Sequence, residues 1–327
     1  MFSNDLELKL NNGKTYLIVD MSNLLYKAFY AREYTGRSAR YDERMELEDD
    51  TDTFGLAHHA ALTTLNKYYK LHKPDKVVAT FDRKSWRKDY TESEACVSKK
   101  PYKGHRRKNM SKTDKERYYD FLNHVQEFEE ILRTHTSIIC LGQDKLEADD
   151  LIAGFVQNNP DDTHIIVSAD GDMLQLLKHE NVSIIDPATG KEKTLEDWEF
   201  DAKYFMFLKC FRGDSGDNVQ SAYPRLRETK IKDAYTDEFK RLNLMDHVWQ
   251  DQNKVQYKVG DLFKENKLLM DLECQPDNIR QLINETIEHG VNNTGQFNYF
   301  KFLNFCGKYS LSKIAGSVEQ YMALLSK

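Results

Sequence analysis

The chain has 327 residues, 40% of them hydrophobic and 12% aromatic, a composition typical of a folded globular protein. No apolar run approaches the ~18 residues of a membrane span, and the N-terminus lacks the pattern of a signal peptide. Five scattered cysteines without metal-binding spacing indicate reduced thiols and a cytoplasmic protein. The net charge of −6 argues against a general nucleic-acid binder, unless positive charge is locally clustered.

Short apolar runs rich in β-branched residues recur in the first 190 residues and have the length of buried strands. They are residues 16–20, 76–82, 137–141, 164–168 and 182–186. Segments with helical spacing of apolar residues alternate with them, at 24–31, 53–72, 114–133, 147–156 and 171–177. This alternation predicts an α/β domain with a mostly parallel central sheet flanked by helices.

After about residue 200 the sequence shows no clear strand. Helices are predicted at 205–211, 264–272, 279–289, 297–305 and 317–325. We therefore expect two domains, an α/β domain over residues 1–200 and an α-rich domain over residues 201–327 packed on the first.

Acidic residues follow the predicted strands or open the helix after them. They are Asp20, Asp82, Glu147, Asp149, Asp150, Asp170 and Asp172. Ligands of parallel sheets bind at the carboxyl ends of the strands, so these carboxylates are expected to converge there. Their mutual repulsion calls for a cation, and an all-carboxylate set suits Mg²⁺ or Mn²⁺.

Each acidic motif has a simpler explanation when taken alone. Acids in a first helical turn complement the helix dipole, and Asp-Gly is a common turn. The Gly/Asp-rich stretch 212–218, which contains Asp214 and Asp217, also reads as a turn. The recurrence of carboxylates after several strands is what favours a metal site.

Residues 83–117 contain thirteen Lys or Arg against five Asp or Glu. Such a run is usually a solvated charged segment. Three aromatic residues among the charges, Trp86, Tyr90 and Tyr102, also suit a segment that grips phosphates and stacks on bases. Because the tract leaves directly from Asp82, we favour the second interpretation. Its charge surplus and few apolar residues also predict that it is mobile without substrate.

The ordered set of motifs resembles the 5′-nuclease family, which includes flap endonucleases, the 5′→3′ exonuclease domains of bacterial DNA polymerases and phage ribonucleases H. Strand-terminal acids, a basic tract, Glu147-Ala-Asp-Asp, Asp170-Gly-Asp and Gly213-Asp-Ser-Gly-Asp-Asn carry the resemblance. The motifs cover residues 16–218, and the C-terminal third matches loosely. The implied fold is a PIN-like nuclease core with a helical arch, at about 83–117, and an α-helical duplex-binding domain.

The resemblance implies two Mg²⁺ ions, for which Mn²⁺ substitutes. The first cluster of ligands is then Asp20, Asp82, Glu147 and Asp149. The second cluster and its outer shell are Asp150, Asp170, Asp172, Asp214 and Asp217.

The segment Tyr102-Lys103-Gly104-His105-Arg106 is similar to the Tyr-Lys-Gly-Asn-Arg segment of the family's arch. By this likeness Lys103 and Arg106 are the catalytic cations facing the scissile phosphate. Further contacts with nucleic acid are expected from Lys84, Arg87, Lys88, Arg107, Lys108, Arg225, Arg227, Lys230 and Lys232. The last four lie where the family has a glycine-rich phosphate-binding motif, whose glycines are absent from residues 219–227.

The implied activity is hydrolysis of RNA primers, DNA 5′ ends and 5′ flaps during DNA replication. Implied partners are flap DNA and RNA–DNA hybrids, with a single-strand-binding protein or a sliding clamp as a further partner of a monomeric enzyme. If phage-encoded, the protein acts in the host cytoplasm. Two alternatives stay open, a PIN-type metal-dependent ribonuclease and a non-catalytic nucleic-acid-binding protein.

Overall fold

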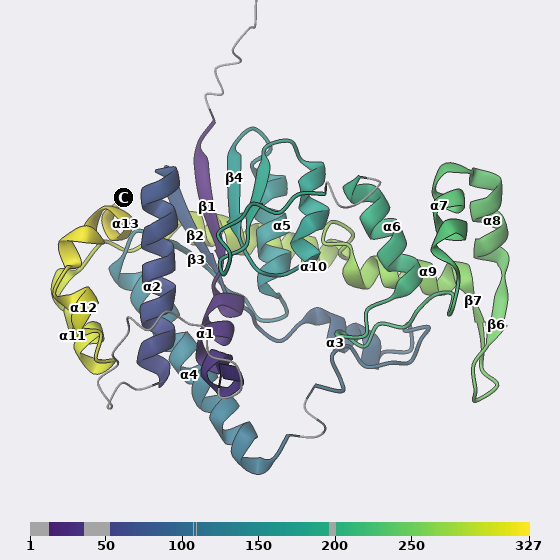
Figure 1. Cartoon of the computed structure of the whole chain (residues 1–327), viewed down its shortest axis with the longest axis horizontal. Coiled ribbons are helices and arrows are strands. Elements are labelled where there is room, and N and C mark those ends of the chain that lie inside the picture. Colours follow the sequence, from purple (N-terminus) through teal and green to yellow (C-terminus); the bar gives the residue numbers. More distant parts are fainter. Residues whose placement is uncertain (1–12, 36–52, 107, 109, 196–200) are drawn as a thin grey trace, which may run out of the picture.

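A five-stranded parallel sheet forms the centre of the computed structural model, which describes residues 13–35, 53–106, 108, 110–195 and 201–327 (Figure 1). Its strands are β1 (Thr15–Asp20), β2 (Lys76–Thr80), β3 (Ile139–Leu141), β4 (Thr163–Val167) and β5 (Val182–Ile185). They lie in the order β3-β2-β1-β4-β5, and every neighbouring pair is parallel. The predicted α/β class and the parallel sheet are confirmed.

Side chains of successive strand residues enter two different hydrophobic cores, as the pleat of a strand requires. In β1, Leu17 and Val19 belong to one core, whereas Tyr16 and Ile18 belong to the other. Both faces of the sheet are therefore covered, which explains why the strands read as continuous apolar runs and not as alternating ones.

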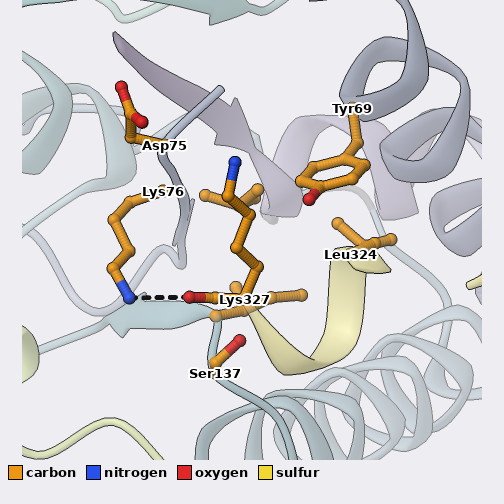
Figure 2. A pocket seen from close by; sticks show the side chains of 8 residues that line it. Tyr69, Asp75, Lys76, Ser137, Leu324 and Lys327 are labelled. Atoms are coloured by element: carbon orange, nitrogen blue, oxygen red, sulfur yellow. Dashed lines mark hydrogen bonds between the residues drawn. The ribbon is translucent and has the colours of Figure 1, made fainter. Parts of the chain in front are cut away.

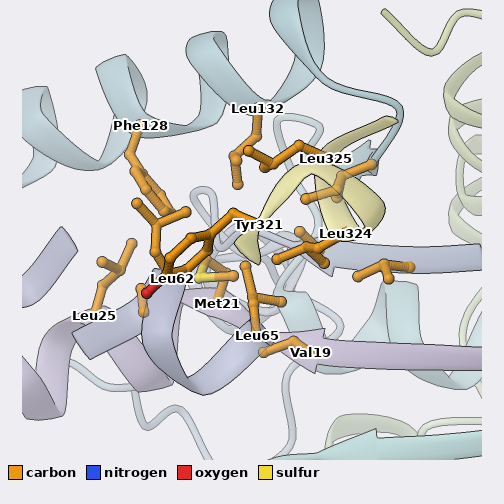
Figure 3. Close-up of a cluster of buried hydrophobic side chains, with 14 of the residues drawn as sticks. Val19, Met21, Leu25, Leu62, Leu65, Phe128, Leu132, Tyr321, Leu324 and Leu325 are labelled. Atoms are coloured by element: carbon orange, nitrogen blue, oxygen red, sulfur yellow. The ribbon is translucent and has the colours of Figure 1, made fainter. Parts of the chain in front are cut away.

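The first core lies under helices from both ends of the chain (Figure 3). These helices are α1 (Met21–Thr35), α2 (Thr53–His72), α4 (Lys112–His135), α11 (Tyr299–Lys308), α12 (Ser312–Ala315) and α13 (Met322–Ser326). Figure 3 shows Tyr321, Leu324 and Leu325 packed among Leu62, Leu65 and Leu132.

The second core is covered by α5 (Ala148–Asn158), the 3₁₀ helix η1 (Asp172–Lys178) and α10 (Asp277–Asn292). The amphipathic spacing of Ile279, Ile283 and Ile287 places one side of α10 on this core. Residues 277–325 therefore pack on the central sheet. The boundary expected at residue 200 does not coincide with this packing, because linear order does not show which core an amphipathic helix joins.

A smaller group of elements beside the sheet has its own core, around Phe211, Ile231 and Leu262. It consists of α6 (Ala202–Arg212), α7 (Glu228–Thr236), α8 (Glu238–Asp246), β6 (Val248–Gln250), β7 (Gln256–Lys258) and α9 (Val259–Met270). The antiparallel pair β6–β7 and the helices α7 and α8 were missed by the pattern analysis. Of the helix predicted at 317–325 only the second half is α-helical, as part of α13, because a 3₁₀ turn (Val318–Gln320) occupies the first half.

The basic tract is folded over most of its described length. It contains α3 (Trp86–Glu92), and a loop whose backbone at Ser98 donates a hydrogen bond to Glu265 on α9 at 3.0 Å. Trp86 and Tyr102 are both only 4% exposed, so the prediction that they stack on bases is wrong. The tract lacks periodicity because contacts with α9, far away in sequence, hold it in place. Residues 83–106 are held by these contacts, and the mobility expected of the tract without substrate stays a prediction.

Lys327 lies next to the start of β2 and is hydrogen-bonded to residues there (Figure 2). The Lys76 ammonium donates to the Lys327 carbonyl oxygen at 2.7 Å, and the Lys327 ammonium donates to the Pro74 carbonyl at 3.1 Å.

Of the helices in the described residues, none combines the length and the apolar character needed to cross a membrane.

We expect Phe302→Ala to lower the free energy of unfolding by about 3–5 kcal/mol, because Phe302 is fully buried in the first core. The matched control is Phe300→Ala on the same helix, where the side chain is 76% exposed and the expected change is below about 0.5 kcal/mol. Urea unfolding of both variants measures the difference. Equal losses would contradict the assignment of α11 to the core of the sheet.

Candidate metal centre

Three aspartates follow neighbouring strands at the carboxyl edge of the sheet. Asp20 ends β1, Asp82 lies just after β2, and Asp170 lies just after β4. Because β1 is paired with both β2 and β4, these strand ends are adjacent. Asp20 is 6% exposed and accepts hydrogen bonds from the Asn23 backbone at 3.0 Å and the Ser168 hydroxyl at 2.9 Å.

Helix α5 brings further carboxylates to the same edge. Glu147 is its N-cap residue and is 7% exposed, and Asp149 follows in the first turn. The Ala148 backbone donates to an oxygen of Asp82 at 2.8 Å, which ties the start of α5 to the end of β2. One oxygen each from Glu147, Asp149 and Asp150 lies within 4.8 Å of the others.

The electrostatics of these groups fit a bound cation. Burial, followed by repulsion from Asp82, raises the pKa of Asp20 to about 7. Burial and the charges of Asp150 and Glu147 also raise the pKa of Asp149. The positive charge nearby thus does not fully balance Asp20 and Asp149. Their ligand atoms are carboxylate oxygens, which hard divalent cations prefer.

Arg87 and Asp150 form a buried ion pair beside this cluster. Arg87 is 1% exposed, and its guanidinium donates to both Asp150 oxygens at 2.8 Å and to Glu147 at 3.0 Å. Its Nε donates to the Leu269 carbonyl at 2.6 Å. The prediction that Arg87 contacts nucleic acid is wrong, because no surface of it is available. Asp150, expected in the second metal cluster, has both oxygens bound to Arg87.

Lys209, which the sequence reasoning missed, lies between two of the expected second-cluster acids. Its ammonium donates to Asp172 and lies 3.1 Å from an oxygen of Asp214. The charge of Lys209 thereby joins η1 to the loop after α6. A detectable signal existed, since Lys209 is the only charged residue in the otherwise apolar stretch 205–211.

Asp217 connects the basic tract to the loop after α6. It accepts hydrogen bonds from the Tyr102 hydroxyl at 2.7 Å and from Arg106 at 2.5 Å. Its carbonyl oxygen accepts from the Lys103 backbone at 2.8 Å. In the described structure, Asp217 therefore acts as an anchor of the segment that carries Lys103 and Arg106.

The ammonium of Lys103 reaches the carboxylate cluster, where it donates to Glu147 at 2.5 Å and lies 3.7 Å from Asp217. Burial opposes its charge, but Glu147 and Asp217 outweigh this effect and raise the pKa of Lys103. Lys103 therefore stays protonated beside Glu147.

The other predicted cations lie outside this centre. Lys84 is exposed and pairs with Asp89 at 2.7 Å, and Lys88 is half-buried. Lys108 is exposed, whereas Arg107 lies outside the described residues. Two of the cations, Arg225 and Arg227, precede α7. The other two, Lys230 and the half-buried Lys232, lie on it. A second missed cation, Lys193, donates to the Asp170 carbonyl oxygen at 2.8 Å.

Comparisons with known proteins agree with this arrangement. The model of the 5′-3′ exonuclease, N-terminal resolvase-like domain matches residues 15–205. Ribonuclease H of Enterobacteria phage T4 is 26% identical over 227 residues, covering 66% of this chain and 72% of that protein. A bacteriophage T5 protein co-crystallised with metal ions has a TM-score of 0.59 at 18% identity, covering 85% of this chain and 99% of that one. A T5 flap endonuclease complex with DNA and metal ions has a TM-score of 0.57 at 16% identity, covering 85% and 100%.

The family model and the T4 relative are both named for hydrolytic nucleases. The chain belongs to the 5′-3′ exonuclease family, because the family model spans more than half of its length. The predicted family and enzyme class are confirmed. At below 25% identity, the likeness to the T5 structures shows that the fold is shared.

The raised pKa of Asp20 predicts that the metal-free protein loses stability as pH rises. A carboxyl group with a folded pKa of about 7 and an ordinary unfolded value stabilises the fold fully below about pH 4. This contribution is lost as pH rises through 7. Thermal unfolding in EDTA from pH 4 to 8 should show the loss, and Asp20→Asn should reduce it. The control Asp161→Asn, at an exposed position, should retain the wild-type slope. A slope unaffected by Asp20→Asn would refute the assignment.

Arg87→Met should lower the free energy of unfolding by about 3–5 kcal/mol, because it leaves Asp150 buried without its partner. Lys84→Met removes an exposed cation and should cost less than about 1 kcal/mol. The double variant Arg87→Met/Asp150→Leu should recover part of the loss. Denaturant unfolding measures all three, and a double variant less stable than Arg87→Met would contradict the ion-pair explanation.

Proposed function

We propose that this protein is a divalent-metal-dependent 5′→3′ exonuclease and flap endonuclease that removes RNA primers and DNA 5′ ends or flaps during replication. The observation that carries the proposal is the convergence of Asp20, Asp82, Glu147 and Asp170 at one sheet edge, with Lys103 against Glu147. Its family membership supports the same reaction class. The named activities of the T4 and T5 proteins support the choice of substrates.

In the proposed site, Asp20, Asp82, Glu147 and Asp149 hold one Mg²⁺ ion, which Mn²⁺ can replace. A second ion is assigned to Asp170, Asp172 and Asp214. When bound, such a pair of ions lowers the pKa of a water molecule and stabilises the attacking and leaving oxygens. Lys209 positions Asp172 and Asp214, and Asp150 acts through Arg87 on Glu147.

Lys103 and Arg106 are proposed to face the scissile phosphate. Both are fixed by Asp217, and Lys103 stays protonated, so a positive charge is already in place when negative charge grows on the phosphoryl oxygens. The protein supplies no nucleophile in this scheme. Its side chains hold cations and orient the phosphate, which is how most of the barrier to phosphoryl transfer is lowered.

The remaining assignments concern binding. Exposed Lys84, Lys108, Arg225, Arg227 and Lys230, together with Lys88, Arg107 and Lys232, are proposed to contact the phosphates of flap DNA or an RNA–DNA hybrid. We further propose a monomer that works in the cytoplasm alongside a single-strand-binding protein or a sliding clamp.

The first test is metal dependence. Cleavage of a labelled 5′-flap substrate should stop in excess EDTA and return with Mg²⁺ or Mn²⁺, because among the described residues no Cys or His accompanies the clustered carboxylates. Asp20→Asn should shift the restoring Mn²⁺ concentration upward by about tenfold or more, since it removes one charged ligand. Undiminished cleavage in EDTA would refute the proposal. Flap binding without cleavage under every metal condition would instead indicate a non-catalytic binding protein.

Lys103→Ala should lower the single-turnover rate at saturating enzyme by at least about tenfold, because the lost contact acts on charge in the transition state. Lys115→Ala, which removes an exposed cation of α4, should leave that rate unchanged and reduce the salt dependence of binding by roughly one charge. Rates and affinities of both variants across salt concentrations decide the matter. If Lys103→Ala keeps the full rate at saturation, it is a steering charge only.

A further inference from the structure

A cavity of about 350 Å³ lies between α6 and α9, and side chains of η1, α7 and α8 complete its wall. Its lining residues are Lys178, Ala202, Lys203, Met206, Phe207, Cys210, Tyr235, Arg241, Met245, Phe263, Lys267 and Asp271. Lys209, the α6 residue that contacts the acids of the proposed active site, is not among them. The cavity is therefore a separate feature of the molecule.

The inner surface of the cavity is apolar and rich in sulfur and aromatic rings. Met206 and Cys210 are buried at positions one turn apart on α6, and Phe207, Met245 and Phe263 are half-buried around them. Methionine side chains adapt to differently shaped apolar partners. A volume within the roughly 300–1,000 Å³ of typical ligand sites is enough for one bulky side chain.

The polar residues of the lining carry mostly positive charge. Four cations, Lys178, Lys203, Arg241 and Lys267, accompany one acid, Asp271, and Lys178 is paired with Glu273 at 2.6 Å. Lys203 and Lys267 are exposed, on α6 and α9 respectively. An apolar cavity with cations at its edge is complementary to an apolar group flanked by negative charges.

We propose that this cavity binds an acidic peptide segment of a partner protein, which inserts one bulky apolar side chain and places its carboxylates near Lys203 and Lys267. The lining disfavours a nucleotide base, because a base would leave its hydrogen-bonding edge unpaired against Met and Phe side chains. The Tyr235 hydroxyl, the main neutral polar group there, already donates to Asp201 at 3.0 Å. An apolar side chain carries no such cost.

The experiment uses the full-length protein and a fluorescein-labelled peptide, Asp-Glu-Asp-Leu-Phe-Asp-Glu, followed by fluorescence anisotropy. The expected Kd is of micromolar order and rises with salt. K203E/K267E should weaken binding by at least about tenfold, whereas the control K264E, on an exposed α9 position outside the lining, should change it less than about twofold. A peptide with Ser in place of Leu and Phe should not bind. Flap cleavage by K203E/K267E should equal that of the wild type.

Several results would overturn the proposal. Absence of binding to the wild type is one, and equal effects of K203E/K267E and K264E are another. Displacement of the peptide by oligothymidylate, with oligothymidylate binding lost in K203E/K267E, would assign the cavity to nucleic acid.

The chain itself contains an acidic segment with bulky apolar side chains, because residues 196–200 are Glu-Asp-Trp-Glu-Phe. If W198A/F200A binds the peptide and the wild type does not, the occupant is the chain's own segment. None of these results depends on whether the protein is a nuclease.

Discussion

Repulsion among carboxylates at the carboxyl edge of the sheet is the constraint on which the rest of the site depends. Asp20, Asp82 and Glu147 come from separate segments. In addition to burial, Asp82 raises the pKa of Asp20 and Glu147 raises that of Asp82, whereas Lys103 and Arg87 lower the pKa of Glu147. Such a group is stable only with positive charge nearby. In the described structure, Arg87 and Lys103 provide part of that charge through contacts with Glu147, and Lys209 does the same for Asp172 and Asp214. The connections between the sheet, the basic tract and α6 follow from these pairs.

This constraint also explains why the basic tract has fewer free charges than its composition suggests. Of the cations that were expected to grip phosphates, Arg87 is wholly internal, and Lys103 and Arg106 are held by acids. A run of like charge in a sequence is commonly taken as solvated surface. Here part of it is the counter-charge of a distant acidic cluster, so local composition overstates the charge available to a ligand.

Features that depend on residues close together in the sequence could be predicted, whereas contacts between distant residues could not. Strands β1 and β4 and the aspartates after them were predictable, because strand length, β-branching and strand-terminal acids are local signals. The partners of Arg87 were not, since they lie 60 residues away at Glu147 and 182 residues away at Leu269. The neighbouring residues in the sequence look the same around a buried Arg or Lys as around an exposed one. Only the three-dimensional arrangement distinguishes them.

The two kinds of cation in the cluster differ in what metal binding would require of them. The planar guanidinium of Arg87 is held by hydrogen bonds to Asp150 and to the Leu269 carbonyl oxygen. It cannot move away without leaving the Asp150 carboxylate buried and unpaired. Lys103 has a flexible stem, with Glu147 as its nearer carboxylate partner and Asp217 at 3.7 Å. If Glu147 ligates a metal ion as proposed, the ion and Lys103 compete for the charge of the same carboxylate. Metal affinity then includes the free energy of weakening the contact between Lys103 and Glu147.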